Sequence, residues 1–219
     1  MPPFNSPPPS LSVFRPRERE VIARCRTPLL VQRWLNSLSY NREPSGETLR
    51  SFREVVRRGE AHCLEAGLSA AAILEQYGYP PMLMSLESQD KLDHVIFVFQ
   101  HGGCWGSVAR SRDLGLHGRK PVFRSLRDLT YSYFDPYVDH TGRILAYGMT
   151  DLRVLGTYDW RFSVLNRWKV EDHLREIPHR SITSSDARYE RLHARYQEFK
   201  RRHPTSPPKY YTGQERWLR

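Results

Sequence analysis

The sequence predicts an α+β fold in which N-terminal helices and a central buried helix pack on an antiparallel sheet. Three observations lead to this prediction. Residues 16–58 repeat apolar side chains at helical spacing. Residues 61–77 form a run that is rich in alanine and other small residues, as expected of a helix that packs closely on its neighbours. Residues 80–152 hold short runs of β-branched and aromatic residues separated by turn-forming stretches such as QHGG.

Each N-terminal helix has a recognisable boundary. The first is expected at residues 16–24 and the second from Pro28, because proline suits the first turn of a helix. A third spans residues 47–58 and ends at Gly59, which can adopt the left-handed conformation of a helix C-terminus. The small-residue helix follows at 61–77 and is closed in the same way by Gly78.

The strands and the remaining helices follow in sequence. Strands are expected at residues 80–86, 93–99, 104–110 and 142–152, with a hairpin joining the second and third. Helices are expected at residues 125–134, 161–177 and 185–203. The chain is therefore divided into a disordered Pro-rich tail at 1–15, one domain at 16–180, and a basic C-terminal helix and tail at 181–219.

The net charge of +10 gathers near the C-terminus, where residues 175–219 hold 11 Lys and Arg against 5 Asp and Glu. Two interpretations stay open. The segment is either a solvated helix with a frayed end or a surface for nucleic acid or another acidic partner. We expect the first, because no nucleic-acid-binding motif is present. The oligomeric state cannot be read from the sequence.

Several classes of protein are not supported. The sequence has neither a signal-peptide pattern nor an apolar run of about 18 residues, so we expect a cytoplasmic protein without a membrane segment. Three widely spaced cysteines do not suit a disulfide framework or a zinc site. No phosphate-binding glycine loop is present, and we expect no cofactor. Asp135, Asp139 and His140 could bind a metal ion, but a turn after a helix also explains them and is the interpretation we favour, so we expect no metal.

Cys63 is the first candidate for chemistry. It lies at the start of the small-residue helix, where free N–H groups and the helix dipole favour a thiolate. Taken alone, Cys63 is better explained as a small, packed core residue. The adjacent His62 could tune the thiol or face solvent.

His94 strengthens the case for Cys63. It begins a predicted strand whose alternation places His94, Ile96 and Val98 on one face, and we expect the cysteine helix to pack on that sheet. A base on a strand that faces a thiol at a helix N-terminus is the arrangement required for nucleophilic catalysis. Asp113 is the nearest carboxylate after the following strand and is the candidate to orient the imidazole.

These residues carry a resemblance to a known family. The run GEAHCLEAGLSAAAILEQYGYPPMLMSL, followed by LDHVIFVF and GCWGSVARSRD, resembles the core of the transglutaminase-like superfamily, in a bacterial-type member. Papain-type peptidases share a related Cys–His–Asp core. The resemblance implies Cys63 as nucleophile, His94 as base and Asp113 as acid. In the family the acid lies closer to the strand's tryptophan, where this chain has Ala109, so Ser111 or another polar group could orient His94 instead.

The resemblance implies an acyl-transfer enzyme that attacks an amide or ester carbonyl through Cys63. Water as acceptor gives a hydrolase that acts on a peptide or protein amide, which is the expected activity. An amine as acceptor gives a transglutaminase, and the sequence does not choose between them. The alternative is an inactive member of the superfamily that serves as a binding module through its basic C-terminus.

Overall fold

A five-stranded antiparallel sheet forms the centre of the protein. The computed structural model describes residues 7–89, 94–138 and 142–206. The strand order is β5-β4-β3-β6-β7, and every neighbouring pair is antiparallel. The strands are β3 (Met82–Ser88), β4 (His94–His101), β5 (Cys104–Val108), β6 (Ile144–Asp151) and β7 (Arg180–Ser181). The predicted α+β class with an antiparallel sheet is therefore confirmed.

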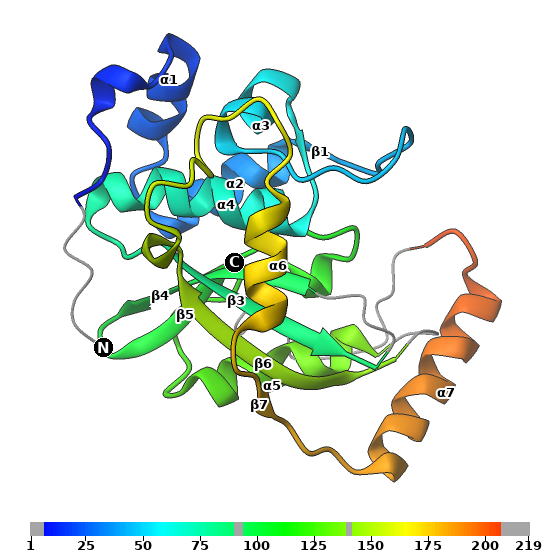
Figure 1. The fold of residues 1–219 in the computed structure, drawn as a ribbon. Helices are drawn as coiled ribbons and strands as arrows, with labels where there is room; N and C mark the ends of the chain where they lie inside the picture. The colour runs from blue at the N-terminus through cyan, green and yellow to red at the C-terminus, as the bar shows by residue number, and fades with distance from the viewer. Residues whose placement is uncertain (1–6, 90–93, 139–141, 207–219) are drawn as a thin grey trace.

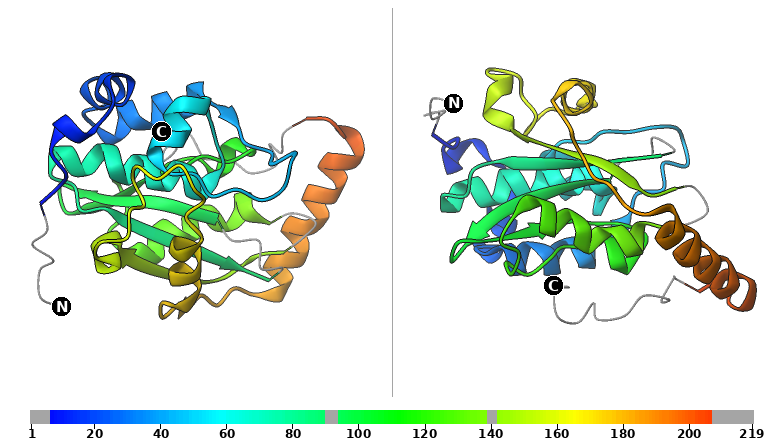
Figure 2. Two further views of the ribbon diagram at one scale, coloured as in Figure 1. Left: turned by 45° about the horizontal axis from the view of Figure 1, so that its top comes forward. Right: turned by 90° about the horizontal axis from the view of Figure 1, so that it is seen from below.

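Helices cover both faces of this sheet. The N-terminal layer contains α1 (Pro16–Arg24), α2 (Pro28–Ser37), α3 (Phe52–Arg58) and α4 (Cys63–Leu74), and the later helices are α5 (Leu126–Tyr137), α6 (Trp168–Glu176) and α7 (Asp186–Arg202). Side chains alternate along β4, so Val95, Phe97 and Phe99 join the core beneath α4, whereas Ile96 and Val98 join the core beneath α5. Figure 2 shows α4 and α5 on opposite sides of the sheet.

The central helix α4 is buried from Leu64 to Leu74. Its small side chains allow a close approach to the sheet. A Cβ added at Gly67 would lie 3.1 Å from Cδ2 of Leu83 on β3 and 3.8 Å from Cγ1 of Val95 on β4. The run predicted as a helix at 61–77 is α4 followed by a 3₁₀ turn, η2 (Glu75–Tyr77), and Gly78 closes it with a positive φ of 82°.

A short parallel ladder leads directly into α4. Strand β1 (Ser39–Tyr40) pairs with β2 (Glu60–Ala61), and Tyr40 lies opposite Ala61. The next two residues of the chain are His62, which is the N-cap of α4, and Cys63. This ladder was not predicted, because two-residue strands leave no repeating pattern in the sequence.

The start of α6 differs from the prediction of a helix at 161–177. Backbone hydrogen bonds join Arg161 O to Arg53 N and Arg167 N to Leu49 O, and the Ser51 hydroxyl donates to Ser163 O. Because residues 49–53 satisfy these groups, residues 161–167 run alongside them and the helix begins only at Trp168.

The two ends of the described chain also have defined courses. The sequence predicts a disordered tail at residues 1–15. In the described part of this segment, Leu11–Val13 forms a 3₁₀ turn and Phe14 is buried against Phe52 and Phe162. At the other end, α7 stands out from the body of the protein (Figure 1). It is attached by Leu192 and Tyr196, which pack on Phe134 and Val138.

The ladder between β4 and β5 stops before it reaches the start of β4. Its last pair is Phe97 with Val108, three residues after His94. Beyond it, the amide of Gln32 on α2 binds both backbone groups of Ala109, at 2.8 Å from the carbonyl and 3.0 Å from the N–H, and also accepts from Gly118 N. Because Ser107 bonds Arg119 on the edge of β5 that faces away from β4, Ala109 presents its backbone groups to that same edge, and Gln32 satisfies them there.

Candidate active site

Cys63 occupies the first residue of α4 and lines a cleft of about 460 Å³. That volume lies within the usual range for small-molecule sites. None of the three cysteines, all of which are described, forms a disulfide. Burial raises the pKa of Cys25 to about 11, so that thiol is not a candidate nucleophile. Cys104 is half-buried at the start of β5.

Two imidazoles hold the Cys63 thiol. Burial acts to raise its pKa, but hydrogen bonds with His62 and His94, together with the charges of both rings, hold the pKa of Cys63 well below the usual thiol value. A lowered pKa increases the thiolate fraction at neutral pH, which is the form that attacks carbonyl carbon. The structure thus brings Cys63 and His94 together, with His62 as a second imidazole beside the sulfur.

The position of His94 on the sheet relative to α4 differs from the expected one. His94 shares a face with Ile96 and Val98, and its ring centroid lies 5.9 Å from that of Tyr133 on α5. The helix carrying Cys63 packs on the opposite face of the sheet. The thiol and the imidazole therefore meet past the end of the β4–β5 ladder, where no β5 residue pairs with His94. The prediction that the cysteine helix packs on this sheet is confirmed, and α4 lies on the face opposite to His94.

The orientation of His94 depends on the loop after β5. Its Nε2 lies 2.9 Å from the carbonyl oxygen of Leu116, so Nδ1 is the ring nitrogen left for Cys63. Leu116 ends the 3₁₀ turn η3 (Leu114–Leu116), whose N-cap is Asp113. The Asp113 carboxylate accepts a 2.9 Å hydrogen bond from Gly115 N. Asp113 thus shapes the turn that presents the Leu116 carbonyl to the imidazole.

His62 is the N-cap of α4. Its Nδ1 accepts from Leu64 N at 3.2 Å, and its Nε2 lies 2.8 Å from the Thr48 carbonyl oxygen. Burial acts to lower the pKa of His62, but the Cys63 thiolate and then Glu65 raise it to about 9. That pKa belongs to the ion pair with the thiolate. When the sulfur is neutral, the bond from Leu64 N keeps Nδ1 unprotonated.

Glu65 anchors the wall of the cleft beneath these groups. Its carboxylate is fully buried and accepts from the side chains of Asn41 and Thr48 and from the backbone N–H groups of Arg50 and His62. It stands three residues after the N-cap, as in a capping box. The sequence pattern of a capping box usually begins with Ser or Thr. Because His62 stands in that place, this capping box could not be recognised from the sequence.

The rest of the cleft carries an aromatic side chain and charges of both signs. Trp168 is exposed at the start of α6, and Glu171 pairs with Arg175 one turn further on. Tyr40, Glu47 and Arg112 also line the cleft. This open and mixed lining suits a segment of peptide or protein better than a small apolar ligand.

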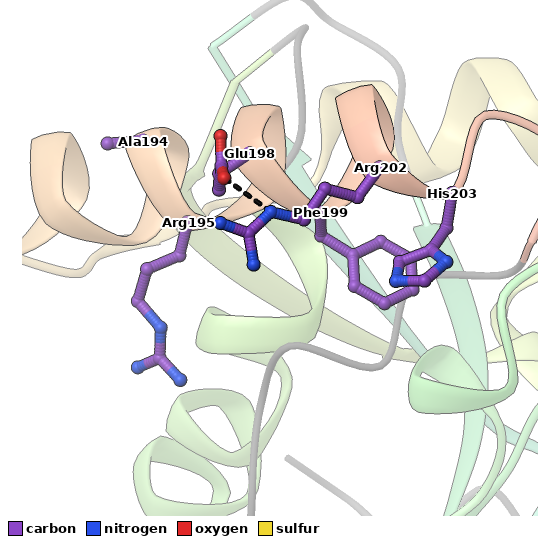
Figure 3. A pocket seen from close by; sticks show the side chains of 6 residues that line it. All are labelled: Ala194, Arg195, Glu198, Phe199, Arg202 and His203. Atoms are coloured by element: carbon purple, nitrogen blue, oxygen red, sulfur yellow. Dashed lines mark ion pairs between the residues drawn. The ribbon is translucent and has the colours of Figure 1, made fainter.

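A second hollow lies along α7 (Figure 3), and Cys63 is not among the residues that line it. Its volume is also about 460 Å³, and Figure 3 shows Phe199 and His203 side by side in it. Arg202 pairs with Glu198 at 2.6 Å. The lining holds neither a cysteine nor a hydroxyl nucleophile, so the cleft at Cys63 is the better candidate for an active site.

Within the described residues, no helix is long and apolar enough to cross a bilayer, and no three His, Cys, Asp or Glu residues are grouped as metal ligands. Of the residues weighed as a metal site, Asp135 instead pairs with Arg188. Asp139 and His140 lie outside the described residues.

The fold is similar to that of solved structures, whereas the sequence comparisons found no match. No family model and no curated protein matches the sequence. Among solved structures, Legionella pneumophila LapG matches with a TM-score of 0.40 and 12% identity, covering 70% of this chain and 96% of that chain. At this degree of similarity, the assignment of chemistry rests on the residues of this chain alone.

Proposed function

We propose that this protein is a cysteine acyl-transfer enzyme of the transglutaminase-like kind that hydrolyses an amide or peptide bond. One observation carries the proposal. Cys63 begins a buried helix, is hydrogen-bonded to two imidazoles that lower its pKa, and lines a cleft of about 460 Å³. A packed core cysteine has neither an adjacent base nor a cleft.

The chemistry follows from these positions. The Cys63 thiolate attacks the carbonyl carbon, a C–S bond forms, and the carbonyl electron pair moves to oxygen. When the carbonyl re-forms, the C–N bond breaks, and the protonated His94 gives its Nδ1 proton to the departing amine. His94 then takes a proton from water as the water oxygen bonds to the thioester carbon. The C–S bond breaks, its electron pair returns to Cys63 as the thiolate, and the carboxylic acid is released. The Leu116 carbonyl accepts from Nε2 throughout and stabilises the imidazolium, as Asp113 would if it contacted the ring directly.

The test measures the reactivity of the thiol directly. The rate of Cys63 alkylation by iodoacetamide is followed from pH 5 to pH 10 by mass spectrometry of the Cys63 peptide. The half-buried Cys104 in the same sample serves as the internal control. We expect Cys63 to react well below the ordinary thiol pKa of about 8.5. A profile that coincides with that of a free thiol would remove the support for the proposal.

A second measurement addresses catalysis. Incubation with p-nitrophenyl acetate should add one acetyl group to the wild-type chain, and this adduct should disappear in Cys63→Ala. The binding-module alternative predicts an unreactive Cys63 together with salt-dependent affinity for an acidic polymer, measured with heparin or duplex DNA. The observation that favours this alternative is the row formed by Arg188, Arg191 and Arg195 on α7, the helix that projects from the body of the protein (Figure 1).

A further inference from the structure

We propose that the phenol of Tyr40 is the side-chain donor of the oxyanion hole, acting together with the backbone N–H of Cys63. This inference rests on the proposed function and names a residue for it. An acyl-transfer site must stabilise the negative charge that develops on the carbonyl oxygen, usually with two hydrogen-bond donors. The sequence offers no motif that identifies the second donor.

The ladder between β1 and β2 positions Tyr40 beside the nucleophile. Tyr40 lies opposite Ala61, and Cys63 follows Ala61 by two residues. Asn41 N donates to the Ala61 carbonyl at 3.2 Å, which closes the ladder at this end. Tyr40 and Cys63 line the same cleft, so a carbonyl group bonded to the sulfur would lie within a space that both residues border.

The backbone at Tyr40 is held through the residues on either side of it in the chain. The guanidinium carbon of Arg110 lies 6.0 Å from the centre of the Tyr40 ring, and Arg110 is itself tied to the Leu38 carbonyl at 3.0 Å. On the other side, the Asn41 amide donates to the buried Glu65 at 3.1 Å. A donor that is fixed in place before the reaction loses little freedom when the oxyanion forms.

The phenol keeps its proton at neutral pH. Burial, and next the negative charge of Cys63, raise the pKa of Tyr40 above its ordinary value. Two conclusions follow. The hydroxyl remains a donor over the working pH range, and it lies near enough to the sulfur to sense its charge. The nearby Arg112 is an exposed side chain on a loop and lacks this fixed placement.

The assignment makes a distinctive chemical prediction. Attack on an ester carbonyl forms an oxyanion on the atom next to the new C–S bond, whereas alkylation by iodoacetamide displaces iodide from a saturated carbon and forms none. Removal of an oxyanion donor should therefore slow acylation and leave alkylation unchanged. A residue that activates the thiolate itself would change both reactions together.

The experiment compares Tyr40→Phe with wild type in both reactions. Acylation of Cys63 by p-nitrophenyl acetate and alkylation by iodoacetamide are measured at pH 7.5 by mass spectrometry of the Cys63 peptide. We expect Tyr40→Phe to slow acylation about 100-fold while alkylation stays within about 2-fold. Tyr77→Phe is the matched control, because it removes a hydroxyl that donates to the Ile22 carbonyl at the other end of the same helical segment. It should leave both rates unchanged.

The outcomes separate this inference from the proposed function. If Tyr40→Phe acylates as fast as wild type, or slows both reactions equally, the assignment of Tyr40 is overturned and the enzyme proposal stands. If wild-type Cys63 reacts no faster than a free thiol in either reaction, the proposed function fails and the assignment fails with it. Thermal unfolding of each variant shows whether the fold is intact.

Discussion

Replacement of His62 by asparagine separates its charge from its role as a helix cap. Asparagine is a favoured N-cap residue, so the first turn of α4 should keep a hydrogen-bond acceptor. The cation beside the sulfur is lost. Because that cation lowers the pKa of Cys63, its removal should raise the pKa and reduce the thiolate fraction at neutral pH.

The size of the effect follows from the contact between the two side chains. At an effective dielectric constant of about 20, opposite charges about 4 Å apart interact by about 4 kcal/mol. That free energy is an upper bound on the effect of the substitution, since His94 still acts on the sulfur. We expect the pKa of Cys63 to rise toward the ordinary thiol value.

The assay is the rate of Cys63 alkylation as a function of pH. At pH 6.5 the His62→Asn rate should be lower by about 10-fold or more, and above about pH 10 the two rates should converge, because both thiols are then ionised. His62→Ala is the companion variant. It should show the same shift and lose about 1 kcal/mol of unfolding free energy with the cap. A His62→Asn profile that overlays that of wild type would refute a role for His62 in forming the thiolate.

Two further predictions concern stability. Burial, with Arg110, His94 and Arg119 nearby, lowers the pKa of His117 from 6.5 to about 4, so the folded protein holds this ring neutral while the unfolded chain binds a proton below pH 6.5. The neutral ring therefore costs no stability above pH 6.5, and the free energy of unfolding falls by about 3 kcal/mol as the pH drops to 4. In urea unfolding measured at several pH values, His117→Gln should lack this part of the decrease. An equal decrease in the variant and in wild type would contradict the assignment to His117. Glu75→Gln breaks a buried bidentate pair with Arg161, with both contacts at 2.6 Å, and should cost about 3 kcal/mol or more. The matched change Glu171→Gln removes an exposed pair within one helix and should cost less than about 0.5 kcal/mol by the same measurement, and similar costs for both would show that burial does not decide the effect.

Periodic patterns explain why much of the fold could be predicted from the sequence. The helix at 61–77 and the strands near 82–88 and 94–101 have long runs whose spacing distinguishes a helix from a strand. The start of α6 could not be predicted, because the backbone partners of residues 161–167 lie more than 100 positions earlier in the chain. Contacts between distant segments leave no local pattern.

The candidate site could likewise be predicted from the sequence only in part. Cys63 and His94 could be selected because a thiol and an imidazole are reactive side chains and because each lies near the start of a predicted element. The partner of His94 Nε2 is the Leu116 carbonyl, and a backbone oxygen has no residue type by which it can be identified. Tyr40 could not be placed beside Cys63 until the β1–β2 ladder was seen.

The amide of Gln32 has a consequence for the loop that orients His94. Its oxygen accepts from Ala109 N and Gly118 N, and its nitrogen donates to the Ala109 carbonyl, so one α2 side chain joins the two ends of the loop that carries Leu116. A substitution at Gln32, which does not line the cleft at Cys63, should therefore loosen the Leu116 carbonyl that binds His94 Nε2.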